Sequence, residues 1–305
     1  FVGSSLVRSL LGRGFAVRVL DKARGGLDEG KETGLEVVLA GIEDLEKVKG
    51  AMKDVDAVCH LAESYSSQPR EVFAIDVCGN INLLETAADY GVKHFLFTST
   101  TRVYGKPSYL PVAESHPCVP EDSGRPLYAT AKFTNERLCL LYSRERNLPV
   151  TIFRFWWAYG PEIGGRALRT LADAALRGET MRVPQEAGGS FVHNDDIAQG
   201  FHLAMFNDRA YGQIFNLSSG VFTTWQELAE LLCQLAGSSS RIELVPRDLW
   251  AGESSLGTDA DIPDAWNIDI SKAGKLLGYS PKYSVEEVRR SLAEAMSRLI
   301  ASRRK

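Results

Sequence analysis

The chain has 305 residues, 44% of them hydrophobic and 24% charged, which is enough to bury a sizeable core and excludes an intrinsically disordered protein. Its 35 Lys and Arg against 39 Asp and Glu give a net charge of −4, which excludes the broad basic surface of a nucleic-acid-binding protein. No apolar run approaches the ~18 residues that a membrane span requires, so no membrane partner is expected. Five scattered cysteines without CxxC spacing indicate a reducing compartment, which we take to be the cytoplasm.

Helices and strands are predicted to alternate from the first residues onward. Leucines at helical spacing predict a helix at the start of the chain, ending at Gly12. The predicted strands cover 15–21, 36–40, 56–62, 94–98 and 150–155, and the predicted helices cover 45–52, 72–90 and 128–144. Because these strands lack a polar face, they are typical of a parallel sheet with helices on both sides. We therefore expect an α/β fold with a doubly wound parallel sheet.

Beyond Gly160 and Pro161 this alternation loosens. The pattern there predicts helices over 167–177, 224–236 and 285–302 and one strand over 213–217. We expect residues 1–158 to form a nucleotide-binding domain. Residues 159–305 are expected to form a smaller, mostly helical substrate-binding region, with parts returning to the sheet.

Two residues near the amino end point to a dinucleotide site. Gly3 begins the first helix, where a missing side chain lets a pyrophosphate approach the backbone amides, although an ordinary helix-start glycine fits equally well. Asp21 ends a strand about 20 residues further on, where a carboxylate accepts hydrogen bonds from ribose hydroxyls, unless it merely begins a turn. A carboxylate there repels a 2′-phosphate, which favours NAD over NADP, while Lys22 and Arg24 leave NADP open.

A phenol and an ammonium group lie four residues apart at Tyr128 and Lys132, one turn along the same helix face. Free tyrosine titrates near ~10, so action as a phenolate at neutral pH requires a pKa lowered by about three units. The ammonium group and an oxidised nicotinamide ring, both positive, would lower it. The strand before this helix delivers the hydroxyls of residues 98–101 at its carboxyl end, where open α/β sheets bind ligands.

Several motifs follow one another in a characteristic order. They are His60-Leu61-Ala62, Asn80-Ile81-Asn82-Leu83-Leu84-Glu85, Val103-Tyr104-Gly105, the pentad from Tyr128 to Lys132 followed by Glu136, Arg154-Phe155, Tyr159-Gly160-Pro161, Phe191 to Ala198, and Ser271-Lys272-Ala273. Together they resemble the extended short-chain dehydrogenase/reductase family, in particular its NAD-dependent epimerase/dehydratase branch, over nearly the whole chain. The resemblance implies a Rossmann fold, with a first strand and leading glycines before Phe1, so the sequence is interpreted as N-terminally truncated.

The resemblance also implies roles for individual residues. Thr100 matches the family's catalytic Ser or Thr, Tyr128 its base and Lys132 the residue that holds the nicotinamide ribose. The implied cofactor-binding residues are Gly3, Asp21, Leu61, Ala62, Tyr128 and Lys132, with NAD as the cofactor. The implied substrate-binding residues are Thr101, Arg102, Trp157, Arg166 and His193, and no metal site is implied.

Two of these substrate residues, Trp157 and His193, have a second interpretation, and Arg166 is a substitute for residues that the family carries. Trp157 and its neighbour Trp156 either stack on a sugar ring or pack in the core. Arg166 would replace diphosphate-binding arginines that the family carries and this chain lacks at the matching positions. His193 precedes two acidic residues that open a helix, a position that also fits a purely structural residue.

The chain departs from the family pattern directly after Thr100. Dehydratases of the branch carry Asp-Glu there and decarboxylases a Glu, whereas this chain has Thr101 and Arg102. We therefore predict an NAD-dependent epimerase of a sugar, most naturally a sugar nucleotide, that acts through hydride transfer and a keto intermediate. The alternatives are a dehydrogenase or reductase of a sugar or other secondary alcohol, and a non-catalytic NAD-binding protein. The helices over 72–90 and 128–144 resemble the family's dimer-forming pair, so a homodimer is expected.

Overall fold

The structure is a computed structural model that describes residues 1–64, 66–249 and 264–304. Its α-helices are α1 Val2–Leu11, α2 Leu45–Met52, α3 Pro69–Val72, α4 Gly79–Asp89, α5 Pro126–Glu145, α6 Arg166–Arg177, α7 Asn194–Ala204, α8 Trp225–Ala236, α9 Ser271–Leu277 and α10 Val285–Arg303. Its strands are β1 Val17–Asp21, β2 Leu35–Leu39, β3 Ala57–His60, β4 His94–Thr100, β5 Val150–Phe155, β6 Ala158–Tyr159, β7 Met181–Pro184, β8 Gly188–Ser190, β9 Val192–His193, β10 Gln213–Asn216, β11 Phe222–Thr224, β12 Ile242–Val245 and β13 Ala265–Trp266. The other helical segments are the π-helix η1 Phe73–Cys78 and the 3-10 helices η2 Thr101–Tyr104, η3 Pro120–Asp122, η4 Asp208–Ala210 and η5 Arg247–Leu249.

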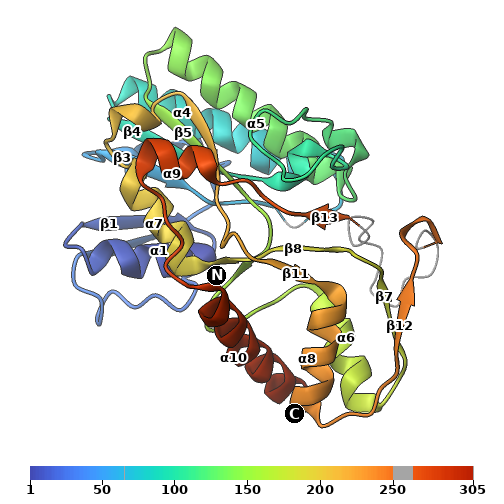
Figure 1. Cartoon of the computed structure of the whole chain (residues 1–305). Coiled ribbons are helices and arrows are strands. Elements are labelled where there is room, and N and C mark those ends of the chain that lie inside the picture. Colours follow the sequence, from blue (N-terminus) through green and yellow to red (C-terminus); the bar gives the residue numbers. More distant parts are fainter. Residues whose placement is uncertain (65, 250–263, 305) are drawn as a thin grey trace.

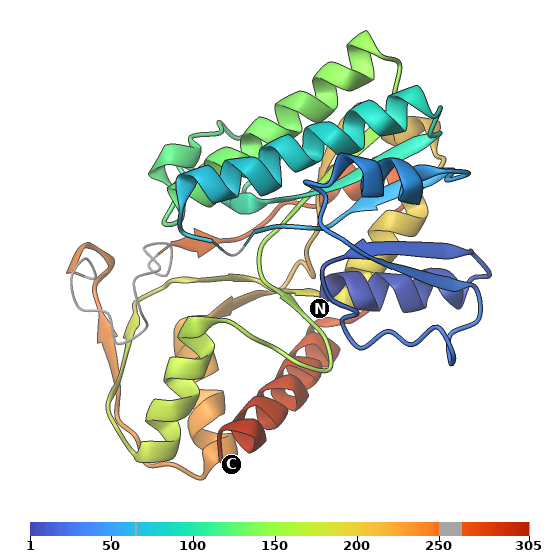
Figure 2. The same ribbon diagram turned by 180° about the vertical axis from the view of Figure 1, so that it is seen from behind.

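The centre of the fold is a parallel sheet with the strand order β10-β5-β4-β3. Helices α2, α4 and α5 cover one face and share an apolar cluster with Phe95 and Phe97 of β4. Helices α1, α7 and α9 cover the other face, where Leu96 belongs to their cluster (Figures 1 and 2). Because both faces are covered, every residue of β4 is buried, which explains why the strand has no solvent-exposed face. The expected doubly wound α/β sheet is confirmed.

Strands β1 and β2 form a separate parallel pair beside this sheet. Among the described residues, no ladder of hydrogen bonds joins β1 to β3. Helix α1 connects the two sheets through opposite sides of its apolar stripe. Leu6 and Leu10 pack with Phe201 of α7, whereas Val7 packs with Leu35 of β2. The amino end of α1 therefore lies near the middle of the molecule, between the main sheet and α10 (Figures 1 and 2).

The helix expected over 72–90 is interrupted, which corrects the sequence interpretation. It consists of α3, the π-helix η1 and α4 in succession. Asp76 lies in the π-helical turn, where its backbone carbonyl accepts a hydrogen bond from the side-chain amide of Asn135 at 2.8 Å. Its carboxylate accepts the backbone N–H of Ser64 at 2.6 Å. π-Helical turns concentrate at functional sites, and this one anchors the segment that follows β3.

The chain beyond β6 builds a smaller part in which α6, α8 and α10 pack around one apolar cluster (Figure 1). Short strands that the sequence analysis missed lie here, including β7, β8, β11 and β12. They are only three or four residues long, and β8 is Gly-Gly-Ser, which has no β-propensity. Strand β10 returns to the main sheet beside β5. The boundary at residue 158 stays a prediction.

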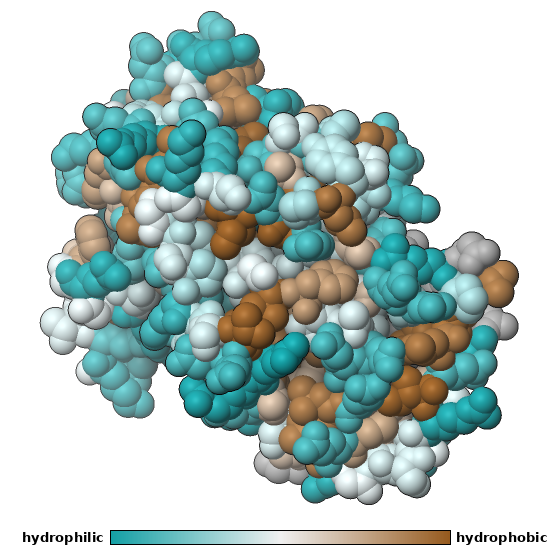
Figure 3. Space-filling model, viewed as in Figure 1, coloured by the Kyte–Doolittle hydropathy of each residue, from teal (hydrophilic) through white to brown (hydrophobic). Residues whose placement is uncertain are grey.

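Hydrophilic residues predominate on the face shown in Figure 3, and hydrophobic residues form scattered patches between them. Within the described ranges, no helix combines the length and the apolar character needed to cross a bilayer.

Protonation of His94 is expected to destabilise the fold in acid. Its buried Nδ1 accepts the backbone N–H of Phe206 at 3.1 Å, so Nε2 carries the hydrogen and donates to Oγ1 of Thr151 at 2.9 Å. Burial lowers the pKa of His94 to about 4. Because this lies below the ordinary value of about 6.5, the unfolded chain binds more protons between these two values. The contribution to stability is therefore complete above about pH 6.5 and is lost as the pH falls toward 4.

The variant His94→Gln tests this expectation. Between about pH 7.5 and about pH 5, the wild-type free energy of unfolding should fall by about 2 kcal/mol more than that of the variant. Urea unfolding at both pH values measures the difference, and the remaining histidines cancel because both proteins contain them. Equal losses in the two proteins would show that His94 does not titrate in this way.

Candidate active site

The candidate site lies at the carboxyl edge of the main sheet, where open α/β sheets bind ligands. Helix α5 carries Tyr128 and Lys132 in its first turns, and β4 ends at Thr100 beside it. The segment after β3 contributes Glu63, three residues beyond His60. Three separate segments therefore bring their side chains to one edge.

Glu63 joins the two α5 residues. The Tyr128 hydroxyl donates a hydrogen bond to Oε2 of Glu63 at 3.1 Å, and Nζ of Lys132 lies 3.5 Å from the same oxygen. Lys132 is 3% exposed, and its Nζ also donates to the backbone carbonyl of Thr98 at 3.2 Å. The expected convergence of phenol and ammonium is thus present, with a carboxylate between them.

The electrostatic setting of Tyr128 differs from the sequence expectation. The pKa of Tyr128 is raised well above its ordinary value, first by burial and then by the charge and hydrogen bond of the Glu63 carboxylate. The positive charges of Arg102 and Arg125 oppose this rise in pKa but do not overcome it. Arg125 lies over the Tyr128 ring, 4.8 Å from its centroid. The Glu63 carboxylate, which the sequence analysis did not foresee, disfavours the phenolate in this arrangement, and the lowered pKa expected from Lys132 together with a bound nicotinamide ring stays a prediction.

Thr100, the last residue of β4, and Thr101 and Arg102, which begin η2, form a wall that contacts α5. Oγ1 of Thr100 accepts the backbone N–H of Arg102 at 3.3 Å and caps η2, which leaves the hydroxyl hydrogen able to donate elsewhere. Thr101 is fully buried, and its hydroxyl has no hydrogen-bond partner among the described residues. The charge of Arg102 acts on both Tyr128 and Asp264, and burial raises the pKa of Asp264 to about 6.

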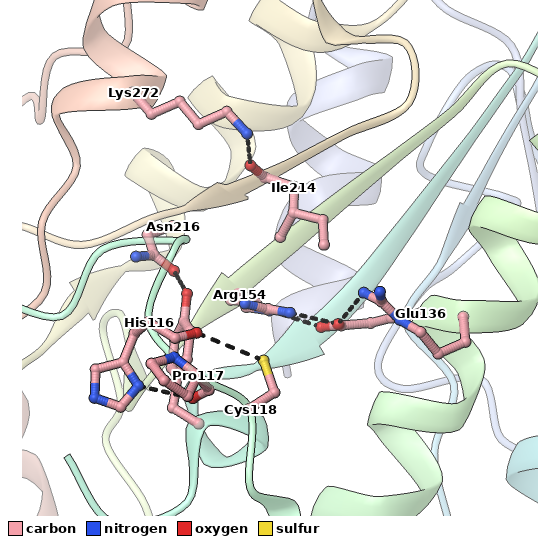
Figure 4. A network of polar contacts seen from close by, with 10 residues as sticks. His116, Pro117, Cys118, Glu136, Arg154, Ile214, Asn216 and Lys272 are labelled. Atoms are coloured by element: carbon pink, nitrogen blue, oxygen red, sulfur yellow. Dashed lines mark hydrogen bonds and ion pairs between the residues drawn. The ribbon is translucent and has the colours of Figure 1, made fainter. Parts of the chain in front are cut away.

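A buried ion pair holds this wall against α5 (Figure 4). Arg154 of β5 donates from Nε to Oε1 of Glu136 at 2.8 Å and from Nη2 to Oε2 at 2.6 Å. Its guanidinium also lies 4.6 Å from the ring centroid of Tyr104 in η2, whose hydroxyl donates to Oδ1 of Asn216 at 2.7 Å. The chain of contacts therefore connects α5, β5, η2 and β10 behind the site.

The amino end of α1 offers a second group of residues on the same side of the molecule. Among the residues that the structure describes, no side chain caps the start of α1, and a Cβ added at Gly3 would meet no heavy atom within 4 Å. Free first-turn amides beside open space are suited to a pyrophosphate. Asp21 is exposed at the carboxyl end of β1, with Oδ1 accepting the backbone N–H of Ala23 at 2.9 Å. Amides, a carboxylate for ribose and the ammonium of Lys132 are the donor set that NAD requires, so the residues present fit this cofactor.

Leu61 and Ala62 connect β3 to Glu63. Both are half-buried, and Leu61 packs toward the α1 and α7 side whereas Ala62 packs toward the α4 and α5 side. In the sequence they lie between α1 and α5, which carries Tyr128. Their role in cofactor binding stays a prediction.

The remaining predicted substrate residues belong to the smaller part of the fold. Trp157 donates from Nε1 to the carbonyl of Gly164 at 2.8 Å and lies edge-on to Trp225, 5.6 Å between centroids. Arg166 is exposed at the first residue of α6. His193 is buried and caps α7, since its Nδ1 accepts the backbone N–H of Asp195 at 3.1 Å. In the part of the chain that the structure describes, no hydrogen bond or ring contact joins these three residues to Tyr128 or Lys132.

The sequence analysis missed Glu63 and Asp76. Glu63 directly follows the His60-Leu61-Ala62 motif, so its place at the end of a parallel strand was the available signal. Asp76 is 2% exposed, and burial raises its pKa while its carboxylate holds the backbone of Ser64. In the sequence, Asp76 is one acidic residue within a predicted amphipathic helix, and such a residue does not indicate a place near the site.

Comparisons with a family profile, with curated proteins and with solved structures each found matches to this chain. Residues 1–218 match the profile of the NAD dependent epimerase/dehydratase family. UDP-glucuronic acid decarboxylase 1 of Arabidopsis thaliana is 31% identical over 298 residues, which cover 94% of this chain and 65% of that protein. The structure of UDP-glucose 4-epimerase from Thermotoga maritima, with UDP-glucose, is 25% identical, with a TM-score of 0.77 over 100% of this chain and 96% of that one. The UDP-glucose 4-epimerase of Thermus thermophilus, in complex with NAD, is 25% identical, with a TM-score of 0.77 over 97% of this chain and 96% of that one.

Proposed function

The chain belongs to the NAD-dependent epimerase/dehydratase family, and on this premise we propose that it is an NAD-dependent epimerase of a nucleotide sugar. The family and the relatives support an NAD-dependent enzyme of nucleotide-sugar chemistry in the broad sense, which includes epimerases, dehydratases and decarboxylases. The choice among these reactions rests on the residues that surround Tyr128.

Arg102 is the observation that favours epimerisation. It lies two residues beyond Thr100, at the position where the resemblance implies the acid of a dehydratase or a decarboxylase, and its positive charge acts on Tyr128. A guanidinium stays protonated at neutral pH, so it cannot deliver a proton to a leaving hydroxyl. Removal and return of a hydride need only the phenol, a hydroxyl donor and the cofactor, all of which the site can supply.

Each residue of the site has a distinct part in this proposal. The first-turn amides of α1 and the Asp21 carboxylate hold the pyrophosphate and the adenosine ribose, and Lys132 holds the nicotinamide ribose. NAD, when bound, supplies the acceptor and later the donor of a hydride. Tyr128 takes the proton of the sugar hydroxyl, and Thr100 donates a hydrogen bond to the oxygen on which charge develops.

The substrate proposal extends to the smaller part of the fold. We assign the sugar to the wall formed by Thr101 and Arg102, and the nucleotide to the side that carries Trp157, Arg166 and His193. On the nucleotide side, an aromatic side chain suits stacking on another aromatic ring, such as the base, and a guanidinium suits the diphosphate. The homodimer expected from α4 and α5 stays a prediction.

In the test, the protein is incubated with NAD and one sugar nucleotide at a time. The three sugar nucleotides are UDP-glucose, dTDP-glucose and UDP-glucuronic acid. We expect the epimer of one of these sugars to accumulate, as detected by proton NMR. The concentration of reduced nicotinamide, measured by its near-ultraviolet absorbance, should stay at or below the enzyme concentration. Released carbon dioxide, a dehydrated sugar, or reduced cofactor that accumulates with turnover would each contradict epimerisation.

A further inference from the structure

We propose that the carboxylate of Glu43 accepts a hydrogen bond from the 6-amino group of the adenine of bound NAD and makes the site selective for this base. This inference deepens the proposed function, on which it rests for the identity of the cofactor. The residues assigned above hold the pyrophosphate and the two ribose groups, whereas none of them is assigned to the base.

The position of the adenine follows from the residue that holds its ribose. Asp21, which is assigned to the adenosine ribose, ends β1, and the parallel pairing of β1 with β2 places it beside Leu39. The carboxyl ends of the two strands therefore meet at one edge, where the backbone carbonyl of Asp21 accepts the N–H of Ala40 at 3.1 Å. The adenosine half extends away from Lys132, and its base then reaches the turn over 40–44 that follows β2.

The backbone of this turn is anchored to the rest of the fold. The N–H of Asp44 donates to the carbonyl of Gly41 at 3.2 Å and closes the turn. The side-chain amide of Asn82 on α4 donates to the carbonyl of Ile42 at 3.0 Å. Ile42 is 5% exposed and packs so closely on α4 that a Cβ added at Gly79 would lie 2.6 Å from its Cγ1. The turn is therefore organised before a ligand arrives, which lowers the entropic cost of binding.

Glu43 folds its side chain back over Gly41. A Cβ added at Gly41 would lie 2.5 Å from Cδ of Glu43, so the carboxylate occupies the space that a side chain at residue 41 would fill. Nζ of Lys22, the residue after Asp21, lies 2.6 Å from Oε1 of Glu43. The side chains of this ion pair are both partly exposed, so a ligand can reach the carboxylate. An acceptor therefore lies next to the residue that is assigned to the adenosine ribose.

The ammonium of Lys22 keeps Glu43 ionised. Its hydrogen bond holds the pKa of the Glu43 carboxyl below the usual value, against the opposing effect of partial burial. An ionised carboxylate only accepts hydrogen bonds, and it has about four acceptor sites, so the ion pair leaves some of them for a ligand. The N–H of Ile42 makes no hydrogen bond within the described part of the chain, which adds a donor to the same turn.

This pairing of an acceptor with a donor matches the edge of adenine. The 6-amino group of adenine donates, whereas the adjacent N1 accepts. In hypoxanthine an oxygen replaces the 6-amino group and N1 carries a hydrogen, so both roles are reversed. An oxygen opposite the Glu43 carboxylate would leave two acceptors facing each other, and a site built to receive an N–H rejects the analogue that lacks it.

The deciding variant is Glu43→Gln, titrated in a calorimeter with NAD and with nicotinamide hypoxanthine dinucleotide. We expect the wild type to bind NAD about tenfold more tightly, because the analogue loses a hydrogen bond to an ionised group. In Glu43→Gln this ratio should fall to about twofold or less, because the glutamine amide turns to offer either an oxygen or an NH2 group. An unchanged ratio in the variant, or equal binding of both dinucleotides by the wild type, would overturn the assignment.

ADP-ribose separates the two halves of the cofactor. It keeps the adenosine and the pyrophosphate but lacks the nicotinamide. Because Glu43 is assigned to the adenine, Glu43→Gln should weaken the binding of ADP-ribose and of NAD by the same factor. Weakening confined to NAD would place the effect at the nicotinamide end and refute the proposal.

These readouts are binding constants, so their outcome is distinguishable from that of the activity test. Failure to epimerise any sugar would contradict the proposed function and leave the base preference intact. Absence of NAD binding by the wild type would overturn both proposals. A ratio of two binding constants on one protein also does not change when part of the sample is unfolded.

Two further variants control the experiment. Lys22→Met removes the same ion pair but keeps the Glu43 carboxylate, so it should keep the preference for NAD. A loss of preference as large as that in Glu43→Gln would show that the ion pair, rather than the acceptor, sets it, and would also overturn the assignment. Glu46→Gln removes a more exposed carboxylate three residues further along, which pairs with Lys49 at 2.9 Å, and should leave both binding constants unchanged.

Discussion

Replacing Tyr128 by phenylalanine is expected to lower kcat by about 10³-fold while binding of NAD persists. The substitution removes one oxygen, which is the atom that we assign to proton transfer and that donates to Glu63 at 3.1 Å. A positioned acid–base group contributes about 10²–10⁴-fold, and no other hydroxyl replaces it in the same place. The lost hydrogen bond is partly exposed, so the free energy of unfolding should change by only about 1 kcal/mol. Steady-state kinetics and calorimetric NAD titration measure the two effects.

Tyr142→Phe is the matched control for this loss. Tyr142 lies on the same helix, and its hydroxyl also donates to a glutamate, Glu85, at 3.3 Å. It lies well over two helical turns further along α5, away from the carboxyl edge of the sheet. We expect kcat close to that of the wild type. If Tyr128→Phe retained turnover within about threefold of the Tyr142→Phe enzyme, the assignment of Tyr128 as the base would be wrong.

The largest effect on stability is expected for Arg154→Met. Arg154 is 1% exposed and donates two short hydrogen bonds to the buried Glu136 carboxylate, whereas the other ion-pair partner of Glu136, the half-exposed Arg137, lies 3.5 Å away. Without the Arg154 guanidinium, the buried Glu136 charge would keep only the longer contact with Arg137, and removal of one partner from a buried pair typically costs about 3–5 kcal/mol. Tyr104 would also lose the cation beside its ring, so η2 and α5 should separate slightly. Urea unfolding should therefore show a large loss of stability accompanied by a loss of kcat.

The double variant Glu136→Leu with Arg154→Met shows whether the loss of stability comes from the buried Glu136 charge or from lost packing at residue 154. Replacing both members of a buried pair by apolar side chains is often neutral in stability, so the double variant should be more stable than Arg154→Met alone. Arg146→Met is the control, because its ion pair with Asp89 at 2.7 Å is exposed and should be worth at most about 1 kcal/mol. A double variant less stable than Arg154→Met would contradict the poorly compensated Glu136 charge as the cause.

The sequence by itself determined the elements and the pair of residues on α5. Periodicity reports burial directly, so the strands and helices of the sheet lie within two residues of their expected bounds, apart from the interrupted helix over 72–90. Tyr128 and Lys132 share a helix face because four residues complete about one turn, whatever the rest of the chain does. Local geometry therefore sufficed for the centre of the candidate site.

Only the tertiary structure decided what surrounds that centre. Glu63 reaches Tyr128 across 65 positions in the sequence, and Arg154 reaches Glu136 from a different element, so no local pattern indicates either contact. The direction of the Tyr128 pKa shift also depends on contacts between residues that are far apart in the sequence. A pKa depends on the sum of burial and all neighbouring charges, and the sequence showed the ammonium of Lys132 but not the carboxylate that folding brings beside the phenol.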